Sequence, residues 1–359
     1  MPPLPPQAQP RKGRGAAFNP DNRFFPRRSE RTNDGWETES DPLPPLATSV
    51  TVQNSRTILS RNQSPDLPFT LSINPYQGCE HGCIYCYARP SHAYLDLSPG
   101  LDFETRLFAK PDAAALLRAE LARPSHAVST INIGANTDPY QPVEREWRIT
   151  RSVLEVLLET RHPVALITKN RLVLRDLDLL RELATLNLVQ VFISVTSLDA
   201  ELMRVLEPRA SAPHRRLQAI GALADAGVPV GVMAAPMIPF VNDHELERIL
   251  EAAAHAGATR AGYTFLRLPW ELKALFRDWL ATHLPLKADR VMATIRESRG
   301  GKDNDSDFSQ RMTGTGPFAE LLRQRFAVAC RRHGLNGPRT PLRTDLFRPP
   351  RADGQLSLF

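Results

Sequence analysis

Three of the four cysteines in the chain lie within eight consecutive residues. Cys79, Cys83 and Cys86 have the spacing C-x3-C-x2-C, whereas Cys330 is far along the chain. Three thiolates on one short loop can bind three irons of a [4Fe–4S] cluster, and without a fourth nearby cysteine one iron is left open to another ligand. The spacing therefore predicts a metal centre with one open position.

The residues around the cysteines are also compatible with zinc in place of an iron–sulfur cluster. Gly78 and Gly82 give the loop the backbone freedom that wrapping a cluster requires. His81 and His92 are nearby, so a Cys3His zinc site is the structural alternative. We expect Cys330 to be a buried, inert thiol.

The elements that position this loop begin at residue 71, where short β-branched runs alternate with amphipathic segments. Strands are predicted at 71–75, 129–135, 164–168, 189–195, 229–234 and 260–266. Helices are predicted at 113–122, 150–161, 174–186, 214–226 and 243–255, and after the last strand at 271–282, 287–299 and 318–333. Six βα units are too few for a closed eight-stranded barrel, so we expect an α/β fold with a partial (βα)6 TIM-type barrel.

Composition divides the chain into four parts. Residues 1–45 are rich in Pro and Arg with few aliphatic side chains, and we expect a disordered basic arm. Residues 46–270 form the predicted partial barrel, and 271–338 a helical extension packed on it. Residues 339–359 are again Pro- and Arg-rich and are predicted to be a flexible tail.

Bulk properties restrict the class of protein. With 359 residues, 42% hydrophobic and 23% charged, the chain has the composition of a folded protein. No apolar run approaches the roughly 18 residues of a membrane span, and the first residues lack the apolar core of a secretory signal, so we expect a cytoplasmic protein. The net charge of +6 is compatible with a nucleic-acid partner.

The cysteine motif and several other segments resemble a known family. C-x3-C-x-aromatic-C after the first strand of a βα barrel is similar to the radical S-adenosylmethionine (SAM) superfamily. The segments INPYQGCEHGCIYCYAR, IGANTDPYQPVE, LITKN and FISVTS resemble its spore photoproduct lyase-like, or DNA repair photolyase-like, branch. The resemblance implies a [4Fe–4S] cluster that reductively cleaves SAM to a 5′-deoxyadenosyl radical, which abstracts hydrogen from a substrate. It further implies a reductant such as flavodoxin or ferredoxin, and nucleic acid as the substrate class.

The resemblance also assigns SAM-binding roles to residues in or after the predicted strands. They are Tyr85 for the adenine, Asn136 and Thr137 for the methionyl amino group, Lys169 for the carboxylate, Ser194 for the ribose and Ala235 for a backbone contact with adenine. For Thr137 the alternative is a cap of the turn in TDPYQP, and for Lys169 an exposed strand end. No further catalytic residue is predicted.

One feature of the branch is missing from this chain. Spore photoproduct lyase has an additional cysteine on its second strand that returns a hydrogen atom to the product radical. The corresponding segment here is INIGAN, without cysteine. We therefore expect the fold and the radical initiation to be shared, but not the reaction on the spore lesion.

The chain ends in Gln-Leu-Ser-Leu-Phe, which resembles the peptide by which bacterial DNA repair and replication proteins bind the sliding clamp. Leu358 and Phe359 would fill an apolar pocket, while Gln355 and Leu356 would contact its rim. The alternative is a tail folded back on its own domain.

Two other classes of function remain open from the sequence. One is a nucleic-acid- or clamp-binding protein whose iron–sulfur cluster is structural or redox-sensing. The other is a zinc-bearing interaction module.

The terminal peptide gives a direct prediction. A peptide ending at Phe359 is expected to bind purified sliding clamp at roughly micromolar to tens of micromolar concentration, and the Phe359→Ala peptide is expected not to bind, because its apolar anchor is lost. Fluorescence anisotropy measures both. Equal binding, or none, of the two peptides would remove the clamp hypothesis.

Overall fold

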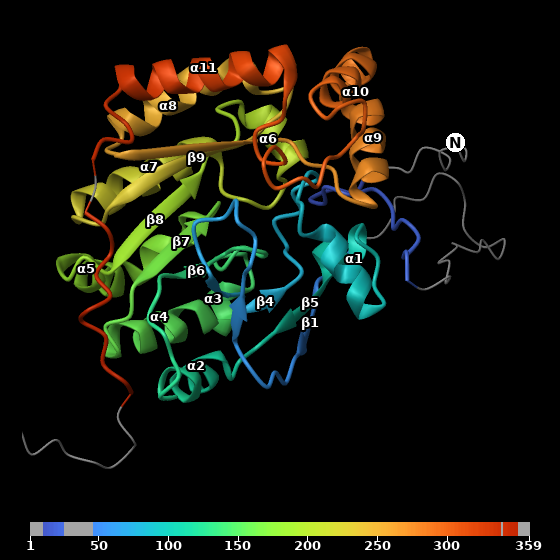
Figure 1. The fold of residues 1–359 in the computed structure, drawn as a ribbon. Helices are drawn as coiled ribbons and strands as arrows, with labels where there is room; N and C mark the ends of the chain where they lie inside the picture. Colours follow the sequence, from blue (N-terminus) through green and yellow to red (C-terminus); the bar gives the residue numbers. More distant parts are fainter. Residues whose placement is uncertain (1–9, 25–45, 339, 351–359) are drawn as a thin grey trace, which may run out of the picture.

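The structure is a computed structural model, and it describes residues 10–24, 46–338 and 340–350. Its main sheet has seven strands in the order β10-β9-β8-β7-β6-β3-β2 (Figure 1). The strands are β2 (Leu59–Arg61), β3 (Leu71–Ile73), β6 (Ile131–Ile133), β7 (Val164–Thr168), β8 (Val189–Ser194), β9 (Val230–Met237) and β10 (Arg260–Phe265). β3 and β6 to β10 pair in parallel, and β2 pairs antiparallel with β3 at the edge. The predicted six parallel strands in an open arrangement are confirmed.

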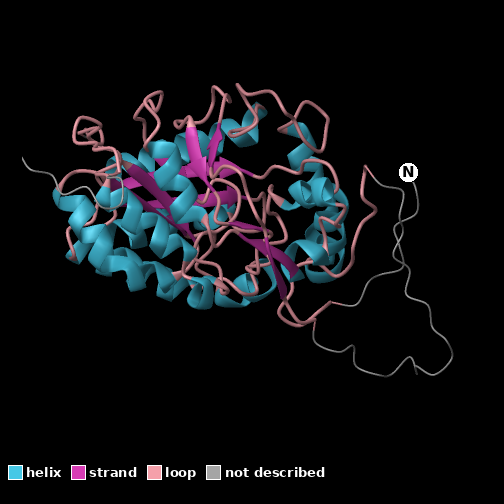
Figure 2. Cartoon of the chain, turned by 90° about the horizontal axis from the view of Figure 1, so that it is seen from below, coloured by secondary structure: helices cyan, strands magenta, loops and turns pink. Residues whose placement is uncertain are grey.

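Helices connect the parallel strands and cover the sheet. They are α2 (Ala113–Leu121), α4 (Ile149–Glu159), α5 (Leu177–Thr185) after η2 (Arg171–Asp176), α7 (Pro213–Asp225), and α8 (Leu246–His255) after η3 (Asp243–Glu245). Figure 2 shows the helices along one side of the strands and loops projecting on the other. Leu166 of β7 and Val191 of β8 are fully buried, as expected for strands of a covered parallel sheet. Gly227 and Gly257 have positive φ, which ends the helices α7 and α8.

The predicted C-terminal helices are present as α9 (Leu272–His283), α10 (Ala288–Glu297) after η4 (Pro285–Lys287), and α11 (Gly316–Arg332). α11 packs along α8, where Arg325 pairs with Glu247 at 2.7 Å. α9 packs against α6 (Ala200–Leu206), and the Trp279 indole donates to the Val205 carbonyl at 2.9 Å. Both contacts join the extension to the barrel.

The prediction did not include several short elements before and within the barrel. β1 (Ser49–Val52), β5 (Arg106–Ala109) and β4 (Tyr76–Gln77) form a separate three-stranded sheet. The remaining elements are η1 (Arg89–Leu95), α1 (Leu101–Thr105) and α3 (Glu144–Trp147). Each is too short for a periodic pattern to develop.

The expectation that residues 1–45 are disordered is wrong for residues 10–24, which we call the N-terminal strap. The strap lies against α1: the Gly15 and Ala16 amides each donate to the Glu104 carboxylate at 2.9 Å. The Arg14 side chain is buried and donates to the Glu104 carbonyl at 2.9 Å, and Arg23 pairs with Glu271 at 2.8 Å. Residues 1–9 and 25–45 lie outside the described residues.

Residues 340–350 likewise contact the barrel, which corrects the expectation of a flexible tail for that part. The Arg343 amide donates to the Asn187 carbonyl at 3.0 Å, and the Arg348 amide to the Thr160 carbonyl at 2.8 Å. The Phe347 ring lies on His126 and His162, with ring centres 5.3 and 5.4 Å apart. The proposed clamp peptide lies outside the described residues. Among the residues described, no helix has the length and apolarity to cross a bilayer.

The histidine pair beneath Phe347 predicts an acid-sensitive stability. Burial lowers the pKa of His162 to about 4. An unfolded histidine titrates near 6.5, so as the pH falls the unfolded chain takes up a proton that folded His162 does not. His162 alone is therefore expected to lower the free energy of unfolding by roughly 2 kcal/mol between about pH 7 and about pH 5.

Urea denaturation at the two pH values measures this effect. His162→Gln is expected to make the difference between the two pH values smaller by roughly 2 kcal/mol. The remainder persists, because burial also lowers the pKa of His92 to about 4. His244→Gln, at an exposed histidine of η3, is expected to leave the difference unchanged. An unchanged pH dependence in His162→Gln would contradict the prediction.

Candidate active site

The cysteine loop follows β3 and β4, near the carboxyl ends of the parallel strands. Its backbone is fixed from two directions: the Cys79 amide donates to the Phe103 carbonyl at 2.9 Å, and the Ile84 amide to the Leu206 carbonyl at 3.1 Å. Gly82 has φ +67°, and a Cβ there would lie 2.8 Å from the Glu104 carboxylate. A glycine is thus required by both conformation and space.

The three thiols are shielded from water. Cys79 and Cys83 are buried and Cys86 is half-buried. Burial raises the pKa of Cys83, with the Glu207 carboxylate adding to the effect, and burial and the Cys79 thiol raise that of Cys86. Three thiolates in this position therefore need a positive partner, and irons would supply that charge.

The three thiols are close enough that Cys79 adds to the effect of burial on the pKa of Cys83 and Cys86, but they do not form a site for a single metal ion. Within the described parts of the chain, no three His, Cys, Asp or Glu side chains converge on a point that one metal ion would occupy. In a cubane each cysteine binds a different iron, whereas a zinc ion requires its ligands to converge. The donor set and its spread fit an iron–sulfur cluster better than a zinc ion.

Both histidines of the zinc alternative have other partners. The His81 ring lies between Asn170, 3.2 Å from Nε2, and Asp138, 3.4 Å from Nδ1. Burial opposes its protonation, but the Asp138 carboxylate and the Cys79 thiol together outweigh burial and raise the pKa of His81 to about 10. His92 Nε2 contacts the Arg106 carbonyl at 2.9 Å. A zinc ion would have to displace one of these partners.

Beneath the loop lies a fully buried ion pair between Arg89 and Glu104, 2.5 Å apart. The Arg89 guanidinium also donates to the Cys83 carbonyl at 2.9 Å and the Gly82 carbonyl at 3.0 Å. A further guanidinium nitrogen donates to the Gly100 carbonyl at 3.0 Å. The pair connects the cysteine loop to α1 and, through Glu104, to the strap.

On another face of the loop, the Tyr85 hydroxyl donates to Glu207 and lies 3.1 Å from the Thr196 hydroxyl. The Thr196 hydroxyl is 2.6 Å from Glu207 Oε1. Glu207 is buried, which raises its pKa in spite of the neighbouring Arg216 guanidinium. Tyr85 is therefore fixed at the ends of β8 and β9.

Arg216 of α7 continues this network to the predicted ribose and adenine positions. It pairs with Glu207 and donates to the Ser194 carbonyl at 3.0 Å. Thr196 connects Ala235 of β9 to the same network, because the Thr196 hydroxyl donates to the Ala235 carbonyl at 3.0 Å. Ser194, Ala235 and Tyr85 are thus parts of one connected cluster.

Lys169 lies at the end of β7 beside the loop. Its ammonium is 5.9 Å from the centre of the Tyr85 ring. Its backbone amide donates to Asp138 at 2.7 Å, and the Thr168 hydroxyl donates to the same carboxylate at 2.6 Å. Burial opposes ionisation of Asp138, but His81 and these donors lower its pKa to about 2. Asp138 therefore positions both Lys169 and the cysteine loop.

Asn136 and Thr137, the two polar residues after β6, make contacts with other groups of the protein. The backbone amide of Asn136 donates to the side-chain oxygen of Asn74 at 3.0 Å. The Thr137 hydroxyl is buried and donates to the Tyr76 carbonyl at 2.9 Å. The turn in TDPYQP is capped by Asp138, whose carboxylate accepts from the Tyr140 amide at 2.9 Å. The contact of Asn136 and Thr137 with SAM stays a prediction.

The structure brings Cys79, Cys83, Cys86, Tyr85 and Lys169 together. Sequence reasoning did not identify the Glu207–Arg216 pair, the Arg89–Glu104 pair or His81 with Asp138 as the groups that hold this site. Glu207 and Arg216 lie nine residues apart across a turn, and no local spacing in the sequence marks such a pair.

The chain is similar in sequence and in fold to known proteins. Residues 73–253 match the sequence profile described as the Radical SAM superfamily. An uncharacterized protein of Mycobacterium tuberculosis is 36% identical over 292 residues, covering 81% of this chain and 80% of that protein. One of Methanocaldococcus jannaschii is 27% identical over 173 residues, covering 48% and 62%.

Among solved structures, spore photoproduct lyase complexed with dinucleoside spore photoproduct matches with a TM-score of 0.53 at 16% identity, covering 80% of each chain. A mutant of that enzyme with bound AdoMet and dinucleoside spore photoproduct matches with a TM-score of 0.52 at 16% identity, again over 80% of each chain. At this identity the likeness concerns the fold.

The buried pair under the loop gives a stability prediction. Glu104→Gln removes the negative charge opposite Arg89 and one acceptor of the strap amides, so it is expected to lower the free energy of unfolding by about 3–5 kcal/mol. Glu159→Gln is the matched control, because its pair with Arg118 is exposed and is expected to contribute about 0–1 kcal/mol. Urea denaturation compares the two. Equal small losses would contradict the role given to Glu104.

Proposed function

Because the chain belongs to the radical SAM superfamily, we propose that Cys79, Cys83 and Cys86 bind three irons of a [4Fe–4S] cluster and that SAM binds the fourth. The observation that carries the proposal is the set of three shielded, separate thiols beside Tyr85 and Lys169. When bound, the cluster supplies the electron that cleaves SAM into methionine and a 5′-deoxyadenosyl radical.

The chain's own residues bind and orient SAM in this proposal. The Lys169 ammonium, next to the loop, pairs with the methionyl carboxylate. The Tyr85 ring packs against the adenine, with its hydroxyl held by Glu207 and Thr196. Asn136 and Thr137 lie toward the amino group.

Ser194 and Ala235 belong to strands whose ends are connected through Arg216 and Thr196, so they present one wall for the ribose and the adenine. The buried position of the thiols keeps water away from the site where a radical would form.

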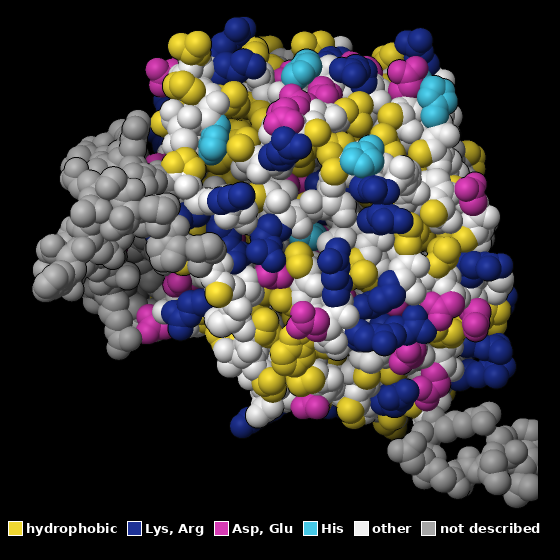
Figure 3. Space-filling model, turned by 180° about the vertical axis from the view of Figure 1, so that it is seen from behind, with side chains coloured by type: hydrophobic (Ala, Val, Ile, Leu, Met, Phe, Trp, Pro, Cys, Tyr) yellow, Lys and Arg dark blue, Asp and Glu magenta, His cyan; other side chains and the backbone are white. Residues whose placement is uncertain are grey.

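For the substrate we propose nucleic acid. The chain carries a net charge of +6, and Figure 3 shows Lys and Arg side chains in the middle and on one flank of one face. Phosphate groups would be attracted to such a surface. The similar solved structure is named as a complex with dinucleoside spore photoproduct. Strand β6 (Ile131–Ile133) has no cysteine, so the hydrogen atom that completes the reaction would come from another group than in spore photoproduct lyase.

Anaerobic reconstitution with iron and sulfide tests the reaction. The reduced protein is expected to form 5′-deoxyadenosine from SAM, measured by liquid chromatography. Cys83→Ala is expected to lose the brown cluster absorption and the product while remaining folded, whereas Cys330→Ala, at the cysteine outside the loop, retains both. A brown wild-type protein that never cleaves SAM would instead support a structural or redox-sensing cluster.

The substrate class is tested in the same assay. Oligonucleotides, undamaged or ultraviolet-irradiated, are expected to accelerate deoxyadenosine formation by roughly tenfold or more if substrate binding positions the reacting groups. An unchanged rate with every oligonucleotide, together with acceleration by a fraction of cell extract free of nucleic acid, would contradict the choice of nucleic acid.

A further inference from the structure

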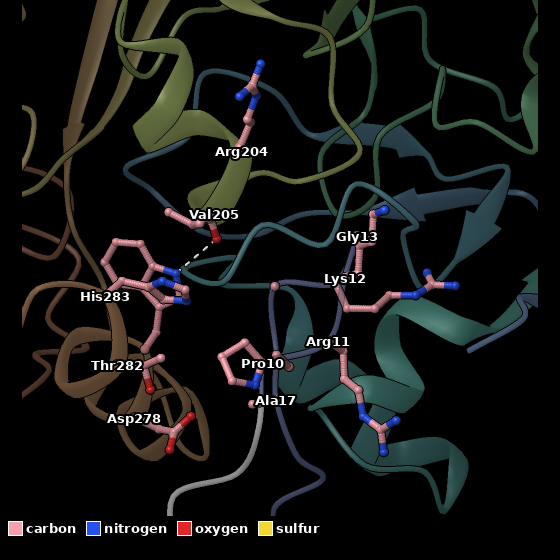
Figure 4. Close-up of a pocket in the computed structure, with 14 residues that line it drawn as sticks. Pro10, Arg11, Lys12, Gly13, Ala17, Arg204, Val205, Asp278, Thr282 and His283 are labelled. Atoms are coloured by element: carbon pink, nitrogen blue, oxygen red, sulfur yellow. Dashed lines mark hydrogen bonds between the residues drawn. The ribbon is translucent and has the colours of Figure 1, made fainter. Parts of the chain in front are cut away.

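A pocket of about 360 Å³ lies between the N-terminal strap, the end of α6 and helix α9 (Figure 4). The strap forms one wall, and His283 of α9 lies opposite, with Val205 of α6 beside it. Trp279 also lines the pocket, and its indole donates to the Val205 carbonyl at 2.9 Å. The pocket is separate from the candidate SAM site, because neither Tyr85 nor Lys169 is among its lining residues.

The inner wall of the pocket is in direct contact with the cysteine loop. The strap approaches the loop so closely that a Cβ on Gly15 would lie 1.8 Å from the Gly82 carbonyl oxygen. Ala16 packs in the same apolar cluster as Cys83. One layer of backbone therefore separates the pocket from the ligand cysteines.

The α6 side of the pocket makes a second connection. Val205 lines the pocket, and the carbonyl of the following residue, Leu206, accepts from the Ile84 amide of the cysteine loop at 3.1 Å. The rate of electron transfer falls steeply with distance. A donor bound at this pocket would be connected to Cys83 through Val205, Leu206 and the hydrogen bond from Ile84.

The lining of the pocket is predominantly basic. Arg11, Lys12 and Arg204 line it, with Asp278 as the one acidic lining residue. Arg14 also lines it, but its side chain is buried and donates to the Glu104 carbonyl, so it adds little to the charge of the surface. Lys12 is exposed, and the Arg204 side chain, which pairs with Glu201 at the surface, is 73% exposed. In Figure 4 the Arg11 and Arg204 guanidinium groups point outward on opposite sides and do not converge on one point. Such a spread favours the broad surface of a protein over a small anion.

We propose that this basic surface around the pocket is the docking site of an acidic one-electron donor protein of the flavodoxin or ferredoxin kind. The inference rests on the proposed function, since only a cluster that must be reduced needs such a donor. One electron leaves the donor, which is oxidised, and reduces the metal centre behind Gly15 and Gly82; no proton or group is transferred. Opposite charges bring the two proteins together.

The same surface is less suited to the nucleic-acid substrate. The substrate must reach the SAM site beside Tyr85 and Lys169, whereas the pocket ends at the backbone of Gly15 and Gly82. A nucleotide seated here would be separated from SAM by the cysteine loop.

Charge reversal tests the proposal in the reconstituted full chain. The double variant Lys12→Glu/Arg204→Glu is compared with Arg248→Glu/Arg332→Glu, at exposed positions of α8 and α11. With reduced flavodoxin at low salt, the rate of cluster bleaching is expected to fall roughly tenfold or more in the first variant only, because steering between opposite charges is lost. Photoreduced deazaflavin, a small donor, is expected to reduce all three proteins at equal rates.

Binding of flavodoxin to the apo chain gives a readout that does not need the cluster or SAM cleavage. The first variant is expected to bind flavodoxin about tenfold more weakly than the wild type. Added salt is expected to lower the affinity of the wild type until it approaches that of the variant. Equal binding and bleaching in all proteins would overturn the proposal, as would loss of oligonucleotide binding with flavodoxin binding unchanged. Absence of deoxyadenosine with deazaflavin in the wild type would contradict the proposed function alone.

Discussion

The buried ion pair between Arg89 and Glu104 fixes the position of the cysteine loop. Burying two charged side chains away from water costs desolvation free energy, which is offset only when the pair is also fully hydrogen-bonded. Here the guanidinium donates to carbonyls of the loop, including those of Gly82 and Cys83, and the carboxylate accepts the strap amides of Gly15 and Ala16. The pair is tolerated because three segments distant in sequence converge on it, and they are held in register as a result.

The loop is consequently fixed between two environments. On the side of Tyr85, the Glu207–Arg216 network connects it to the ends of β8 and β9, where a cosubstrate would lie. On the side of Gly82, the strap separates it from a basic surface. A centre that receives an electron from one partner and delivers it to another ligand needs such separate approaches, and the described residues provide one on each side.

Much of this arrangement could be predicted from the sequence. The six parallel strands have short apolar runs such as Val164–Thr168, in which alternate residues are buried, and these runs alternate with helical segments in a pattern that the sequence shows clearly. The cysteine loop was equally clear, since the chemistry lies in one contiguous segment. The resemblance assigned Tyr85 and Lys169 to SAM, and in the structure the Lys169 ammonium lies 5.9 Å from the centre of the Tyr85 ring. Their contacts with SAM stay predictions.

The remaining features depend on contacts between distant segments. The strap has the composition of a disordered arm, and its order comes from Glu104, some 89 residues away in sequence. The tail at Phe347 is ordered by two histidines of the barrel. Glu207 and Arg216 have no local pattern that marks them as a buried pair. Such partners follow from the fold, and only the fold places them.

The central claim is that three thiolates hold a cluster with one iron free for SAM. Mössbauer spectroscopy of the iron-reconstituted protein, recorded with and without SAM, tests it most directly. The account predicts a [4Fe–4S] spectrum in which SAM changes the signal of a single iron, because only that iron lacks a cysteine ligand. A spectrum that SAM leaves unchanged, or a protein that takes up zinc and no cluster, would contradict it.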